Sequence, residues 1–195
     1  MAPFHSNSHG GNGWVVSGHV AGSEGESMFL PYYDASGSLI TDYLGDAEEV
    51  VDTVDIDCAF LEADSDETIS KYVMDNNIDS KQYPIGGIVT DEELDNNVGN
   101  SDFGVAHRGK GSCDSFGEIQ GTIGAINNRN NTVAVALSNN VAGGDSGGPF
   151  FTLNSDTEAD LVGIVVRDQF DDAGDSVGTT PQTIKNKLDG YFMHI

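Results

Sequence analysis

The sequence has very little basic charge: 8 Lys and Arg residues stand against 32 Asp and Glu residues, giving a formal net charge of −24. Nucleic acids and anionic membranes bind to cationic surfaces, so the composition argues against both as partners. Apolar residues nevertheless make up 37% of the chain, which favours a folded protein over an acidic disordered one. We therefore expect a carboxylate-covered surface of the kind that halophilic proteins have.

Cysteine and long apolar runs are also scarce. Cys58 and Cys113 are the only cysteines, so at most one disulfide can form, and we expect two buried, inert thiols. No run of 18 apolar residues is present, which excludes a membrane-spanning helix. Residues 1–12 are polar and lack the apolar segment of a signal peptide. We expect either a protein that is not exported or the mature or truncated part of a longer precursor.

The apolar residues occur in short runs separated by clusters of Gly, Asn, Asp and Ser. This spacing predicts an all-β sandwich or barrel rather than alternating strands and helices. The runs are 14–16, 27–30, 59–61, 85–90, 121–123, 132–137 and 161–166.

Two segments have helical features. Residues 68–74 are long enough for one or two turns, and Pro181 opens a segment that places Ile184, Leu188 and Phe192 on one side. A polar stretch at 75–81 suggests a boundary between two subdomains, 1–80 and 81–195.

The strongest chemical signal is the motif Gly144-Asp145-Ser146-Gly147-Gly148-Pro149. A serine hydroxyl becomes a nucleophile when a base removes its proton and backbone N–H groups stabilise the resulting oxyanion. Glycine at 144 leaves the backbone free to direct its N–H, with that of Ser146, at one point. The motif therefore predicts a nucleophilic serine.

Such a serine requires a base and a carboxylate that orients the base. Of the five histidines, His19 directly follows the apolar run Val15-Val16, where a rigid element can hold it. Asp57 precedes the apolar run that starts at Cys58, where a carboxylate can be buried against the imidazole. Asp55 is the alternative for the orienting role.

These residues together resemble the chymotrypsin-like serine proteases. Ser17-Gly18-His19 is similar to that family's Ala-Ala-His or Ala-Gly-His, Asp57-Cys58-Ala59-Phe60 to its Asp-Ile-Ala-Leu, and the serine motif matches fully. The resemblance implies two packed six-stranded antiparallel β-barrels with a short C-terminal helix. It also implies a catalytic triad and an oxyanion hole from the Gly144 and Ser146 amides. Only 18 residues precede His19, so the first barrel is expected to lack its first strand.

A further match points to the bacterial streptogrisin-like branch. His107-Arg108-Gly109, followed by residues 116–123, resembles its Arg-Gly and Thr-Gly-x-x-x-Gly-x-Val segment. In that branch an arginine of this segment neutralises the aspartate that precedes the nucleophile. The resemblance therefore implies an ion pair between Asp145 and Arg108.

The substrate-binding edge departs from the family pattern. Val166-Arg167-Asp168 occupies the place of the usual Ser-Trp-Gly. By its place in the family pattern Asn140 falls at the base of the primary specificity pocket, so the aspartate that selects Lys or Arg is absent there. A turn residue is the alternative interpretation of Asn140. We expect these four residues to line the substrate site.

The resemblance implies an endopeptidase that acts on polypeptides without a metal or organic cofactor, as a monomer, in a family whose members are usually secreted. Two alternatives from other classes are a catalytically silent binding module with the same fold and an enzyme that depends on Cys58 or Cys113. The acidic run 168–175 lacks the closing Glu of a calcium loop, which weakens a calcium-binding interpretation.

Overall fold

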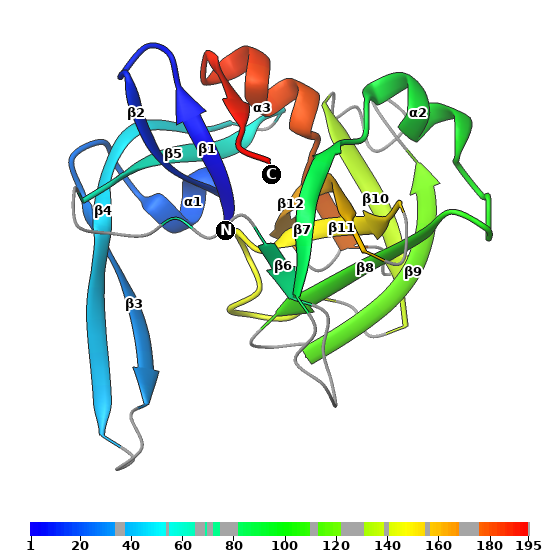
Figure 1. Cartoon of the computed structure of the whole chain (residues 1–195), viewed down its shortest axis with the longest axis horizontal. Helices are drawn as coiled ribbons and strands as arrows, with labels where there is room; N and C mark the ends of the chain where they lie inside the picture. Colours follow the sequence, from blue (N-terminus) through cyan, green and yellow to red (C-terminus); the bar gives the residue numbers. More distant parts are fainter. Residues whose placement is uncertain are drawn as a thin grey trace.

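The computed structural model of the chain describes residues 1–33, 38–53, 55–64, 69, 72–74, 82–109, 113–121, 131–138, 141–154, 157–167 and 176–194 (Figure 1). Most of these residues are in β-strands, as the sequence predicts. The strands are β1 (Ala2–Ser6), β2 (Gly11–Val16), β3 (Ser27–Tyr33), β4 (Leu39–Asp52), β5 (Asp57–Ala63), β6 (Tyr72–Met74), β7 (Gln82–Ile88), β8 (Gly104–Gly109), β9 (Cys113–Gly121), β10 (Thr132–Leu137), β11 (Pro149–Leu153), β12 (Ala159–Arg167), β13 (Ser176–Thr179) and β14 (Gly190–Phe192). The helices within the described residues are α1 (Gly18–Ala21), α2 (Asp91–Asn96) and α3 (Pro181–Lys187).

The larger sheet contains a closed barrel. Its strands follow the order β11, β8, β9, β10, β13 and β12, and β12 pairs back with β11 to complete the ring. Every pairing around this ring is antiparallel. Outside this ring, β7 pairs with β12 in parallel, and β6 pairs with β7 antiparallel.

The smaller sheet has the order β14, β1, β2, β5, β4, β3. It reaches six strands because β14, close to the end of the chain, pairs with β1 through Phe4 and Phe192. The sequence predicts that the first barrel lacks its first strand. In the structure, β14 from the other end of the chain brings the smaller sheet to six strands. The division into 1–80 and 81–195 stays a proposal, and β6 and β14 each pair across it. The β3–β4 hairpin extends as a long arm away from the second barrel (Figure 1).

Side chains that alternate along β2 and β5 contribute to two separate core clusters. Val16 and Leu61 point into a cluster inside the first sheet, whereas their neighbours Val15 and Phe60 point the other way. The second group packs with Ile164 of β12, so this cluster lies between the two sheets. The candidate site residues described below include Asp57, which directly precedes Cys58 of this cluster.

The C-terminal helix is present as predicted, and the other predicted helix is wrong where it can be compared. α3 begins after Thr180, whose hydroxyl accepts the N–H of Thr183, and it buries Ile184 and the adjoining Leu188. Phe192 lies in β14 rather than on the helix. Tyr72–Met74, expected to be helical, is strand β6, because it hydrogen-bonds to the edge of β7. None of the helices in the described residues is long and apolar enough to cross a membrane.

Candidate active site

α1 holds His19 over the start of β5. Ser17 occupies the N-cap position of this short helix without a side-chain cap hydrogen bond, and Gly18 is its first residue. A side chain at position 18 would collide with the carbonyl oxygen of Val51 and would lie 3.1 Å from Oδ1 of Asp57. Glycine is therefore required for α1 to pack this closely against β4 and β5.

His19 and Asp57 form a two-point contact. The imidazole Nδ1 lies 2.6 Å from Asp57 Oδ2, and the backbone N–H of His19 donates to Asp57 Oδ1 at 3.0 Å. An ionised carboxylate only accepts hydrogen bonds, so Nδ1 carries the hydrogen and Nε2 keeps its lone pair. The His19 side chain is 38% exposed and that of Asp57 is 8% exposed. This is the tautomer and the access that a general base requires.

Asp57 is buried, unlike nearly all other acidic residues whose side chains the structure describes. Among the acidic residues that the structure describes, only Asp57 and Asp145 are buried. Burying a carboxylate is costly unless hydrogen bonds or opposite charges compensate for its lost hydration. Asp55, the alternative partner for His19, is exposed. The geometry therefore favours Asp57 as the orienting carboxylate.

The 144–149 motif forms a tight turn that Asp145 holds together. The N–H of Asp145 donates to the carbonyl of Ala142 at 3.0 Å, and the N–H of Ala142 donates to Asp145 Oδ2 at 2.8 Å. The N–H of Gly148 donates to the carbonyl of Asp145 at 2.9 Å. Gly144 and Gly147 have φ of 99° and 85°, a region that favours glycine, which explains why the turn needs both.

Two backbone donors of this turn point to no acceptor in the described part of the chain. The N–H groups of Gly144 and Ser146 make no hydrogen bond to any described residue, whereas those of Asp145, Gly147 and Gly148 are all paired. No atom lies within 4 Å of a Cβ placed on Gly144. Two free amides on either side of one residue match the donor arrangement of an oxyanion hole.

The turn packs directly on the segment that leads into His19. The carbonyl of Val165 accepts both the N–H of Gly147 and the hydroxyl of Ser17, each at 2.8 Å. A Cβ on Gly147 would lie 3.3 Å from Cβ of Val16. Residue 147 is thus in contact with the last residues before His19. The hydroxyl of Ser146 donates to the carbonyl of Val166 at 3.4 Å, and within the described residues it makes no hydrogen bond to His19.

Two buried hydroxyls connect the sheets at this site, and the sequence analysis missed both. Besides Ser17, the hydroxyl of Thr179 on β13 donates to the backbone carbonyl of Asp57 at 3.0 Å. Ser17 stands where the family carries alanine, and this polar replacement was the available signal. The sequence contains no comparable signal for Thr179, because its hydroxyl acquires an acceptor only when β13 packs against β5.

The described surroundings of Asp145 include a side chain that was not predicted to lie there. The Arg108 side chain lies outside the described residues, so the Asp145–Arg108 ion pair stays a prediction. The described side chain next to Asp145 is His107, whose Nε2 lies 3.9 Å from Asp145 Oδ2 with both side chains fully buried. His107 was not singled out from the sequence.

The predicted substrate-binding residues are described only in part. Val166 is buried at the end of β12, and the backbone of Arg167 pairs with Val177 of β13. Asn140, Asp168 and the Arg167 side chain lie outside the described residues. No cluster of metal-ligating side chains occurs in the part of the chain that the structure describes.

Cys58 faces the core between the sheets, on the opposite side of β5 from its neighbour Ala59. It is fully buried, and burial raises the pKa of its thiol to about 12. A thiolate is therefore not formed at neutral pH, which argues against the cysteine-dependent alternative at this residue.

We expect Cys58 to resist thiol reagents while the protein is folded. In molar KCl, dithionitrobenzoate should modify Cys58 only after a denaturant is added, as located by peptide mass mapping. Rapid modification of Cys58 in the folded protein would show that the thiol is accessible and that its assigned burial is wrong.

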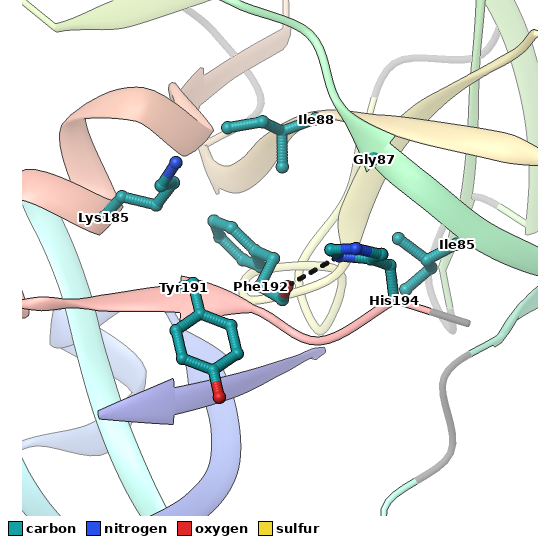
Figure 2. Close-up of a pocket in the computed structure, with 7 residues that line it drawn as sticks. All are labelled: Ile85, Gly87, Ile88, Lys185, Tyr191, Phe192 and His194. Atoms are coloured by element: carbon teal, nitrogen blue, oxygen red, sulfur yellow. Dashed lines mark hydrogen bonds between the residues drawn. The ribbon is translucent and has the colours of Figure 1, made fainter. Parts of the chain in front are cut away.

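A pocket of about 140 Å³ lies between β7, α3 and β14 (Figure 2). Its lining includes Ile85, Lys185 and Phe192 but none of His19, Asp57 and Ser146. Small-molecule sites usually occupy roughly 300–1,000 Å³, so this cavity does not compete with the assigned site.

Neither the models of known protein families nor the curated proteins include a match to the chain. Solved structures do match. Nocardiopsis protease aligns with a TM-score of 0.69 and 18% identity over 98% of this chain and 89% of that chain. Thermobifida fusca protease A aligns with a TM-score of 0.67 and 15% identity over 100% of this chain and 90% of that chain. A glutamic-acid-specific serine protease aligns with a TM-score of 0.68 and 16% identity over 99% of this chain and 92% of that chain. The chain has the two-barrel fold of chymotrypsin-like bacterial serine proteases, so the predicted fold is confirmed.

Proposed function

We propose that the chain is a serine endopeptidase with Ser146 as nucleophile, His19 as general base and Asp57 as the orienting carboxylate. The observation that carries this proposal is the buried Asp57 carboxylate, which accepts both the ring N–H and the backbone N–H of His19. The turn that bears Ser146 packs against the residues before His19 and offers two free amides. The fold supports the proposal, because its structural neighbours are serine proteases.

In the proposed reaction Ser146 Oγ attacks the scissile carbonyl carbon while His19 Nε2 accepts the hydroxyl proton. Asp57 stabilises the resulting imidazolium, and the Gly144 and Ser146 amides donate to the oxyanion. The C–N bond then breaks, and His19 gives its proton to the leaving amine. Water, activated by the same imidazole, hydrolyses the acyl-enzyme and restores Ser146. No metal or organic cofactor takes part in these steps.

The substrate proposal is a polypeptide. Val166, Arg167, Asp168 and Asn140 are proposed to line its binding edge, since they occupy the positions that do so in the family. Position 140 is occupied by Asn rather than by an acidic residue, so cleavage after Lys or Arg is not the proposed specificity.

A catalytically silent binding module remains the second candidate. Ser146 Oγ contacts the carbonyl of Val166 rather than His19, and Val166 replaces a family serine with an apolar residue. Hydrogen bonds of active sites are often loose before substrate binds, so this contact does not decide between the two.

Casein hydrolysis in molar KCl tests the two candidates. A serine protease should release peptides from casein, lose this activity with phenylmethylsulfonyl fluoride, and keep it with EDTA or iodoacetamide. A folded protein that binds casein without cleaving it would support the silent module instead.

We propose a halophilic character for the protein, and this predicts that its stability rises with salt. The acidic side chains that the structure describes, other than those of Asp57 and Asp145, are partly or fully exposed, and the chain as a whole has a net charge of −24. The Debye length falls from about 10 Å at 0.1 M salt to about 3 Å at 1 M, which screens the mutual repulsion. Thermal melts should therefore shift upward from low to molar KCl, equally with NaCl. A midpoint that stayed constant or fell would contradict the prediction.

A further inference from the structure

His107 contacts the motif on both sides of Ser146. Its Nδ1 lies 3.0 Å from the carbonyl oxygen of Pro149, and its Nε2 lies 3.9 Å from Asp145 Oδ2. The imidazole and the Phe150 ring also pack edge to face, with a centroid distance of 5.5 Å and an interplanar angle of 72°. One fully buried side chain on β8 thus touches the residue before the serine and the strand that follows it.

The motif leaves room for this ring. A Cβ on Gly148 would lie 2.9 Å from Cε1 of His107, a distance that side chains do not tolerate. Glycine at 148 and histidine at 107 therefore fit each other. Replacing the glycine would displace the imidazole from its place under the turn.

The contacts define which nitrogen of His107 carries a hydrogen. A carbonyl oxygen only accepts, so Nδ1 is the donor to Pro149 and Nε2 of the neutral ring has a lone pair. Nε2 has no hydrogen-bond partner among the described residues. It faces Asp145 Oδ2, the same oxygen that accepts the N–H of Ala142.

We propose that neutral His107 is a positioning residue for the oxyanion turn, and that its protonation competes with Ala142 for Asp145 Oδ2. A new N–H at Nε2 would need Oδ2 to approach by roughly 1 Å to form a hydrogen bond. That movement would draw Asp145 away from Ala142 and displace the Gly144 and Ser146 amides. This inference rests on the proposed protease function.

The charged groups around the ring set the direction of the effect. Burial, the largest cause, lowers the pKa of His107; the Pro149 carbonyl and the Asp145 carboxylate oppose this, and the α-amino group of Met1 adds to it. Folding thus favours the neutral ring. The turn that depends on neutral His107 should therefore be ordered above about pH 6.5, which is the usual histidine pKa. It should lose this order as the pH falls through the lowered pKa of His107.

Two replacements separate the two ring nitrogens. In His107→Asn the amide reaches only the Nδ1 position and can still donate to Pro149. In His107→Gln it reaches the Nε2 position and can donate to Asp145 at every pH. His5→Asn, a change of a histidine on β1, is the matched control.

The experiment measures kcat and KM for a peptide substrate from acid to neutral pH, with active sites titrated so that misfolded protein does not count. We expect His107→Gln to lower kcat about 10- to 100-fold with little change in KM, because misplaced oxyanion donors weaken transition-state binding. His107→Asn should keep kcat within a few-fold of the wild-type value at neutral pH. Its profile of kcat against pH should lack one of the ionisations that lower the wild-type kcat at acid pH. Imidazole ¹⁵N spectra of the wild-type protein should show the Nδ1–H tautomer near neutral pH.

The possible failures can be told apart. Normal wild-type turnover with unchanged kcat in His107→Gln, or a ring with its hydrogen on Nε2, would overturn the positioning role alone. Equal losses in both variants with an unaltered acid limb would mean that His107 is merely structural. A wild-type protein that neither hydrolyses peptides nor forms an acyl-enzyme would overturn the proposed function, and the positioning role with it.

Discussion

Ser146→Ala is expected to abolish peptide and ester hydrolysis. The variant keeps the turn, because its hydrogen bonds come from the backbone and from Asp145 rather than from the serine hydroxyl. It loses the nucleophile, and only the residual about 10³- to 10⁴-fold acceleration from binding and the oxyanion hole should remain. Hydrolysis of a chromogenic ester and of casein in molar KCl measures the loss.

Ser101→Ala provides the matched control for this change. Ser101 is exposed, lies between α2 and β8, and is not part of the 144–149 motif. Its replacement should leave turnover and melting temperature unchanged. A Ser146→Ala protein that retained most of the wild-type activity would show that another residue is the nucleophile.

Asp57→Asn is expected to reduce kcat by about 10⁴-fold at neutral pH. An Asn side chain can still accept the backbone N–H of His19 with its oxygen, and its NH₂ group then faces Nδ1. Nδ1 must become the acceptor, which moves the hydrogen to Nε2 and removes the lone pair that should take the proton of Ser146. Steady-state kinetics of the purified variant, with the melting temperature as a folding check, provide the measurement.

Asp55→Asn distinguishes a specific role of Asp57 from a general effect of lost charge. Both changes remove one negative charge from the same part of the chain, but Asp55 is exposed. Its replacement should change kcat by no more than a few-fold. Equal losses at the two positions would leave the orienting carboxylate unassigned.

The three residues proposed for catalysis could be selected from the sequence, whereas several of the strands could not. The three residues proposed for catalysis belong to short motifs in which each neighbour has a structural reason, as Gly18 shows by its contact with Val51. β4, from Leu39 to Asp52, was missed although it is the longest strand in the described part of the chain. Its acidic residues, such as Asp46 and Glu48, interrupt the apolar pattern. In a protein that keeps a carboxylate surface, strand positions facing solvent are acidic and hide the usual signal.

Helix α2 was missed for another reason. Thr90 and Glu93 form a capping box, a local signal that was present in the sequence. The helix has only one buried residue, Leu94, so it lacks the apolar periodicity that usually identifies a helix. Capping chemistry, rather than hydrophobic pattern, would have located it.

Which side chains of β8 lie beside Asp145 depends on strand register, which the sequence does not fix. A shift of one residue along a strand changes which side chain faces the interior. His107 and Arg108 are neighbours on β8, and the family pattern alone suggested the arginine. The structure brings the imidazole of His107 beside Asp145. The pairing of β14 with β1 is similarly non-local, because it joins the two ends of the chain.

Covalent labelling with a fluorophosphonate tests the assignment of Ser146 most directly, because the reagent reacts with a serine only when a base and an oxyanion hole activate it. The folded protein in molar KCl should gain one adduct, located on Ser146 by peptide mass mapping. The adduct should be absent from Ser146→Ala, from Asp57→Asn on the same time scale, and from the denatured protein. A folded wild-type protein that stays unlabelled, or that carries the adduct on another residue, would contradict the proposed mechanism.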